Sequence, residues 1–270
     1  MHIDYWGLDH SPFASQLDPS DYYPSAVHEE ALARLDFLIA NGRRLGFLFG
    51  ASGTGKSLVL EVATRQLRRA GSHVIKINAV GLSANELIWK LANGLGHLVP
   101  PNANVVDCWS GISDRLIANR YQRMPTVIMV DDADEAGGDV HAALSRLALI
   151  DPHPDAQITI VLSAQRQRSA AFGSKLNDLC ELRIDIEPWD LDESANYLNE
   201  MLSRVGANDR IFMPDAVDLL FDLSHGVPRR LRQLAELSLL AGAAEELHQI
   251  PAAVVDSVYR GLTHVDSPAA

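Results

Sequence analysis

The sequence is poor in cysteine and in positive charge. Its two cysteines, Cys108 and Cys180, are too few for a disulfide framework and lack the spacing of metal ligands. We therefore expect two thiols in a reducing compartment. Lysine and arginine together number 23 against 35 aspartates and glutamates, so the net charge is −12. This acidic balance does not favour strong non-specific binding to DNA, although a local basic patch would still permit it.

Long apolar runs are also missing. No stretch reaches the roughly 18 apolar residues that a transmembrane helix needs. The longest candidate, residues 231–244, is interrupted by Arg232, Gln233 and Glu236. Residues 1–5 lack the basic start and the long apolar core of a signal peptide. The sequence therefore predicts a cytoplasmic protein with no membrane segment.

Short apolar segments alternate with helical patterns over the first two thirds of the chain. Five of these segments predict strands, at residues 45–49, 73–80, 126–130, 157–162 and 182–186. Strands that alternate with helices imply right-handed crossovers and a parallel sheet covered on both faces. After Pro188 only helical spacing remains. We predict an N-terminal arm at residues 1–24, an α/β domain at 25–188 and an all-α domain at 189–270.

The strongest motif lies directly after the first predicted strand. Residues 50–57 read Gly-Ala-Ser-Gly-Thr-Gly-Lys-Ser and match the Walker A phosphate loop, G-x-x-x-x-G-K-[ST]. The glycines permit a tight turn that aims backbone amides at phosphate oxygens, and the following helix adds its positive N-terminal end. Lys56 is expected to bind the β- and γ-phosphates of ATP, and Ser57 to ligate Mg²⁺. The predicted nucleotide-binding residues are Gly50, Ala51, Ser52, Gly53, Thr54, Gly55, Lys56, Ser57 and Leu58.

A second motif ends the third predicted strand. The apolar residues 127–130 are followed by Asp131 and Asp132, which is the Walker B pattern of a buried strand that ends in an acid. We expect Asp131 to hold Mg²⁺ through its water shell and Asp132 to orient and polarise the attacking water. Many related ATPases have a glutamate at the second position. Asp132 is shorter by one CH₂, so its reach to the water differs.

An extra strand, residues 73–80, separates the two Walker elements in the sequence. This is the arrangement of P-loop ATPases that carry their own catalytic acid, for which the conventional sheet order is 5-1-4-3-2. Asn78 lies at the end of this strand. Either it hydrogen-bonds the catalytic acid, or it is a polar residue that simply ends a strand.

Three more polar residues are candidates for contact with the nucleotide. Ser163 and Gln165 close the fourth predicted strand, where a polar side chain lies between the Walker elements and can touch the γ-phosphate. Arg229 follows Pro228 in the first turn of a predicted helix. A cation at that position opposes the helix dipole. This favours an anionic partner such as ATP over a purely structural role.

The motifs together resemble AAA+ ATPases. The resemblance rests on the Walker A loop, the Asp131–Asp132 pair, the polar end of the fourth strand and the helical domain with its Gly226-x-x-Arg229. The arm is more specific. Asp-Tyr-Trp-Gly-Leu at 4–8, Ser-Pro-Phe at 11–13 and His-Glu-Glu-Ala-Leu-Ala-Arg-Leu at 28–35 resemble the start of the general-secretion-pathway protein A (ExeA-like) ATPases. Those proteins share a broader group with transposition-assisting and origin-recognition-type ATPases.

This resemblance implies a P-loop NTPase with a C-terminal helical lid, which binds and hydrolyses ATP with Mg²⁺. It also implies a homo-oligomer whose sites are completed between neighbouring subunits, and an unidentified protein client. Arg183 is closest to the family position of the arginine finger, with Arg166 and Arg168 as rivals. The lid would convert the nucleotide state into assembly or remodelling. Two alternatives stay open: a DNA-associated adaptor of the transposition or initiator type, and a nucleotide-gated switch with little turnover.

Overall fold

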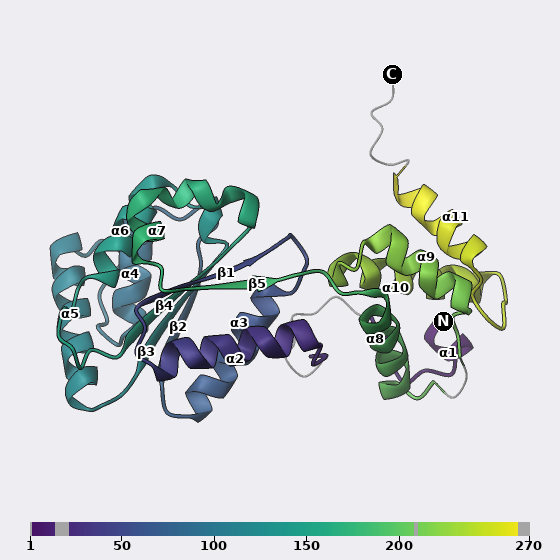
Figure 1. Cartoon of the computed structure of the whole chain (residues 1–270), viewed down its shortest axis with the longest axis horizontal. Coiled ribbons are helices and arrows are strands. Elements are labelled where there is room, and N and C mark those ends of the chain that lie inside the picture. Colours follow the sequence, from purple (N-terminus) through teal and green to yellow (C-terminus); the bar gives the residue numbers. More distant parts are fainter. Residues whose placement is uncertain (1, 14–21, 208–209, 264–270) are drawn as a thin grey trace, which may run out of the picture. The chain divides into compact units, whose positions relative to one another are not determined.

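The computed structural model describes residues 2–13, 22–207 and 210–263. The chain divides into two compact units (Figure 1). One unit consists of Ala26–Ile186 and holds the sheet. The other combines Met1–Ser25 with Glu187–Ala270 and is helical. The described part of the N-terminal arm therefore folds with the C-terminal helices.

A five-stranded sheet forms the centre of the α/β unit. All of its strands are parallel and their order is β2-β3-β4-β1-β5. This confirms the predicted order 5-1-4-3-2, which is the same order read from the opposite edge. The strands are β1 (Leu45–Gly50), β2 (His73–Asn78), β3 (Thr126–Asp131), β4 (Ile158–Ala164) and β5 (Leu182–Ile186). Every residue of β1, β3 and β4 is buried, as expected for strands covered on both faces.

Helices cover both faces of this sheet. Figure 1 shows α2 and α3 on one face and α4 to α7 on the other. Their bounds are α2 (Ala26–Ala40), α3 (Lys56–Arg69), α4 (Ala84–Gly94), α5 (Val105–Tyr121), α6 (Gly138–Ala148) and α7 (Gly173–Leu179), with 3₁₀ segments η2 (Ala133–Glu135) and η3 (Arg166–Phe172). The largest core cluster joins the second face to α4, α5 and α6. Parallel strands place all their carboxyl ends at one edge of the sheet, which is where ligands bind in such folds.

The helical unit is built around a second core. Its helices are α1 (His2–Tyr5), α8 (Leu191–Arg204), α9 (Pro214–Ser224), α10 (Pro228–Ala244) and α11 (Ala252–Thr263). Leu8 and Phe13 of the arm are buried in the same cluster as Leu198 and Leu231. The arm is therefore an integral layer of this unit. None of the helices described is long and apolar enough to cross a membrane.

Candidate nucleotide-binding site

The Walker A residues form the turn from β1 into α3. Gly53 and Gly55 have φ angles of 88° and 103°, in the left-handed region that favours glycine. A Cβ atom on Gly50 would lie 2.5 Å from the hydroxyl of Thr54, so this glycine permits the tight curl of the loop. Among the described residues, no side chain caps the N-terminus of α3. Its first backbone amides are thus available to an anion such as phosphate.

Lys56 is held at the centre of this turn. Its side chain is buried, and Nζ donates hydrogen bonds to the backbone carbonyls of Gly50 at 2.9 Å and Ala51 at 3.0 Å. Both acceptors belong to the loop itself. The two bonds use two of the three donors of the ammonium group and hold it against the loop backbone. The geometry fits a loop that closes around the phosphates of a nucleotide.

His28 contacts the backbone of the phosphate loop, and the sequence motifs did not predict this contact. The residue lies on α2 and is buried, and its Nε2 donates to the carbonyl of Thr54 at 2.8 Å. A Cβ atom on Gly55 would lie only 2.5 Å from this Nε2. The imidazole therefore packs directly against the loop backbone. A single histidine on a helix carries no recognisable spacing, so only the packing of α2 exposes the contact.

The Walker B strand β3 ends at a network of short polar contacts. Asp131 is buried, and its Oδ1 accepts hydrogen bonds from the hydroxyl of Ser163 and, at 3.2 Å, from the backbone amide of Asp132. The Ser163 oxygen also accepts from this amide, at 3.0 Å. Ser163 comes from the neighbouring strand β4 and is fully buried. The structure thus brings Ser163 to the expected metal-binding acid, while its contact with a γ-phosphate stays a prediction.

Asp132 adopts an unusual backbone conformation immediately after β3. Its φ of 51° and ψ of 42° are left-handed, which aspartate tolerates better than most residues. Asn78, from the end of β2, donates a hydrogen bond from Nδ2 to Asp132 Oδ2 at 2.9 Å. The Asn78 Oδ1 accepts from the amide of Val80 at 2.9 Å, which fixes the orientation of the side-chain amide. Of the two alternatives for Asn78, the hydrogen bond to the second acid is the one present.

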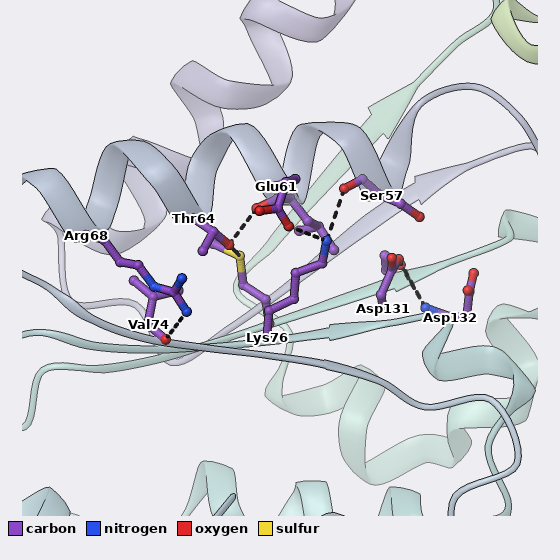
Figure 2. Close-up of polar contacts among 11 residues, drawn as sticks. Ser57, Glu61, Thr64, Arg68, Val74, Lys76, Asp131 and Asp132 are labelled. Carbon is purple, nitrogen blue, oxygen red and sulfur yellow. Dashed lines mark hydrogen bonds and ion pairs between the residues drawn. The ribbon is translucent and has the colours of Figure 1, made fainter. Parts of the chain in front are cut away.

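Ser57 and Asp131 supply the hard oxygen ligands that Mg²⁺ prefers. Figure 2 shows the hydroxyl of Ser57 pointing toward the side on which Asp131 and Asp132 lie. In the described part of the chain, no cluster of three or more His, Cys, Asp or Glu side chains could hold a metal alone. A magnesium ion would therefore need further oxygens from phosphate and water. The residues fit an ion that arrives with a nucleotide.

Lys76 ties β2 to the helix that follows the phosphate loop. Its ammonium pairs with Glu61 of α3 at 2.9 Å and lies 3.4 Å from the backbone carbonyl of Ser57 (Figure 2). Both partners are only partly buried, so the pair contributes little to stability through charge alone. Glu61 lies one turn after Ser57, the expected Mg²⁺ ligand, so the contacts of Lys76 with both residues hold the start of α3 against the sheet. The sequence motifs did not identify this pair.

The remaining predicted residues are spread more widely. Gln165 lies between the end of β4 and the start of η3, and its backbone amide donates to Asp134 Oδ2 at 3.3 Å. Arg183 is exposed on the edge strand β5, in register with Phe47 of β1. It therefore lies well before the carboxyl end of the sheet where the phosphate loop begins.

The two rival arginines make ion pairs within the α/β unit. Arg166 pairs with Asp185, and Arg168 pairs with Glu135. Arg229 is exposed in the first turn of α10 and belongs to the helical unit. Its predicted contact with the nucleotide stays a prediction.

Comparison with known proteins finds an AAA domain within the α/β unit. Residues 39–172 match the family model described as "AAA domain". The chain is 25% identical to general secretion pathway protein A of Aeromonas hydrophila over 254 residues, which is 93% of this chain and 46% of that protein. The chain thus spans about half the length of this curated relative.

Solved structures with the same fold include ORC proteins and a Holliday junction branch migration motor. Drosophila ORC bound to DNA gives a TM-score of 0.74 at 16% identity, covering 97% of this chain and 66% of that one. The Aeropyrum pernix ORC1 protein in complex with DNA gives 0.68 at 19% identity, covering 91% and 68%. The Thermotoga maritima RuvB Holliday junction branch migration motor gives 0.61 at 15% identity, covering 93% and 73%. At these identities the likeness shows the fold alone.

Proposed function

Because residues 39–172 match the AAA domain family, we propose that the chain is an AAA+ ATPase, which binds ATP and hydrolyses it with Mg²⁺. The observation that carries this proposal is the placement of Asp132. Asp132 comes directly after the buried Asp131, and its Oδ2 accepts a hydrogen bond from Asn78 Nδ2 at 2.9 Å. A second acid that is oriented by a neighbouring strand suits the activation of water.

Each residue of the site has a distinct task in this proposal. The loop amides and Lys56 bind the β- and γ-phosphates, and Ser57 with Asp131 would hold Mg²⁺, which neutralises charge on the phosphate oxygens when bound. Asp132 accepts a hydrogen bond from water and orients it. The water oxygen bonds to the γ-phosphorus while the bond from phosphorus to the β,γ-bridging oxygen breaks, which yields ADP and phosphate. Catalysis is then chiefly positioning and electrostatic stabilisation.

A neighbouring subunit would complete the site and make the protein a nucleotide-dependent assembly or remodelling switch. Arg183 is exposed, and it has no ion-pair partner among the described residues, whereas Arg166 and Arg168 are paired. This supports Arg183 as the arginine finger that a second copy offers to the γ-phosphate. Arg229, in the helical unit, would link nucleotide binding to that unit. The protein client is unidentified.

The binding and chemical steps can be separated by two substitutions. Lys56→Ala is expected to abolish tight ATP binding, since the loop has no other side-chain cation to meet the phosphates. Asp132→Asn is expected to keep ATP binding and to slow hydrolysis. Calorimetry with ATP and a phosphate-release assay give the two readouts. Unchanged ATP affinity in a folded Lys56→Ala protein would refute the phosphate-loop assignment.

The shared site is tested by mixing two inactive proteins. Arg183→Ala keeps an intact loop, and Lys56→Ala keeps an intact finger, so a mixed interface unites both. An arginine finger contributes on the order of 10³–10⁵ in rate in other phosphoryl-transfer enzymes, so recovery of activity on mixing should be large. Wild-type activity per molecule should also rise with protein concentration. No recovery, with activity constant on dilution, would contradict completion of the site in trans.

A nucleotide-gated switch with little turnover is the second candidate. The specific observation in its favour is Asp132, which is one CH₂ shorter than glutamate and sits in a left-handed conformation. On this alternative, Asp132→Glu would raise a very low rate of hydrolysis. The third candidate, a DNA-associated adaptor, predicts ATP-dependent DNA binding that weakens steeply with salt. Neither effect is expected if the chain is an active ATPase without a DNA partner.

A further inference from the structure

The outer edge of β2 is open in the part of the chain that the structure describes. β2 is the first strand of the sheet and pairs only with β3 there. The backbone amides of His73 and Ala79 donate to the carbonyls of Pro125 and Asp131, at the two ends of β3. The backbone amides and carbonyls of the odd-numbered residues of β2 therefore point toward β3. In a parallel pair, the alternate residues then turn both backbone groups outward. Val74, Lys76 and Asn78 are these residues.

A groove runs along this open edge. It has a volume of about 440 Å³ and is lined by five consecutive residues of β2, at 74–78, together with residues of α3 and α4. We name it the β2 groove. One outward carbonyl, that of Val74, is already bonded to Arg68 of α3 at 3.1 Å. No hydrogen bond from another described residue reaches the outward amide and carbonyl of Lys76.

The lining of the β2 groove is cationic although the chain as a whole is acidic. Arg68, Lys76 and Lys90 line the groove, and none of its described lining residues carries a carboxylate. Glu61 pairs with Lys76, which leaves Arg68 and Lys90 as the cations that face a ligand. Both are exposed. A net charge of −12 on the whole chain makes this local excess distinctive.

We propose that the β2 groove docks an extended acidic segment of a partner protein, which adds to β2 as a further strand. The outward backbone of Lys76 and Asn78 would pair with the backbone of the segment, and carboxylates on the segment would meet Arg68 and Lys90. Strand addition at a sheet edge takes affinity from main-chain hydrogen bonds and specificity from side-chain pockets. A nucleic acid could satisfy the cations but not the alternating amide and carbonyl groups, so a peptide is the better match.

The probe is a blocked hexapeptide of alternating glutamate and valine, titrated into the full chain by calorimetry. Two matched peptides accompany it: one with lysine in place of glutamate, and one N-methylated at alternate amides. The glutamate peptide is expected to bind, and both matched peptides to fail. Amide exchange measured by NMR should show protection of Lys76 and Asn78 on binding. Absence of heat and of protection at millimolar peptide would overturn the proposal.

Charge reversal locates the binding surface. Lys90 is exposed on α4, and Lys90→Glu should weaken the affinity for the glutamate peptide by about tenfold, the scale of a well-placed charge contact. Lys175→Glu, an exposed lysine on α7, makes the same change in net charge and should have no effect. Equal weakening by the two variants would overturn the proposal, and so would equal binding of the N-methylated peptide. A DNA duplex that bound in a Lys90-dependent manner while the peptide did not would show a nucleic-acid surface instead.

Discussion

Replacing Asn78 with aspartate tests the orientation of the second acid with almost no change in shape. The aspartate keeps an oxygen that can accept the hydrogen bond from the Val80 amide, which Asn78 Oδ1 accepts at 2.9 Å in the wild type. On the other side it replaces the donor that faces Asp132 Oδ2 at 2.9 Å with a second carboxylate oxygen. The substitution therefore converts one attraction into a repulsion at the proposed catalytic acid. All other contacts of the site stay intact.

The magnitude follows from this distance. Two unit charges at 2.9 Å repel by about 1.4 kcal/mol even in a medium as polar as water. Loss of the amide hydrogen bond removes about 1 kcal/mol more. Asn78 is exposed and Asp132 only partly buried, so the water-like value is the appropriate one. A displacement of Asp132 driven by the sum of the two, roughly 2.4 kcal/mol, should lower kcat by up to about sixtyfold.

The assay compares steady-state hydrolysis with ATP binding in the same preparation. Asn78→Asp should lower kcat and leave the ATP dissociation constant unchanged, because the phosphate loop is not touched. Asn85→Asp provides the matched control, since Asn85 is exposed on α4 and gives the same change in net charge. Equal kcat values for wild type and Asn78→Asp would refute the proposed role of Asn78. A loss of ATP binding that parallels the loss of kcat would refute the division of tasks.

Three further predictions address other parts of the chain. Ser163→Ala removes the donor to the Walker B acid and should raise the Mg²⁺ concentration for half-maximal hydrolysis, with no change if Ser163 is only packing. Gly226→Ala should lower the urea concentration at which the helical unit unfolds, because its Cβ would lie 1.9 Å from the Trp189 carbonyl oxygen. Gly261→Ala should not, because none of the described residues comes within 4 Å of a Cβ at that position. The backbone amide of Ser83 holds the pKa of Glu86 below its ordinary 4.5. The free energy of unfolding that Glu86 contributes is thus present above that pKa and is lost as the pH falls through its lowered value. The free energies of unfolding of wild type and Glu86→Gln should therefore converge in acid.

The sequence alone identified the elements whose requirements are local. The phosphate loop needs glycines and a lysine within eight consecutive residues, and buried parallel strands need short apolar runs, so both patterns are visible without a structure. The place of Asp131 and Asp132 followed because the pair comes directly after one such run, at residues 127–130. The order of the strands followed from the class of ATPase that these motifs indicate. Backbone geometry and hydrophobic patterning act between near neighbours, which is why a linear reading finds them.

The contacts that support the site were decided by tertiary packing. His28 meets Thr54 across 26 residues, Lys76 meets Glu61 across 15, and Ser163 meets the Walker B acid across 32. No spacing rule links such pairs, because each depends on how two separately formed elements come to lie together. The sequence of the arm likewise does not show what its apolar residues pack against. Only the folded structure places Leu8 and Phe13 among the C-terminal helices. A buried side chain takes its partner from the packing around it, and that packing is a property of the whole unit.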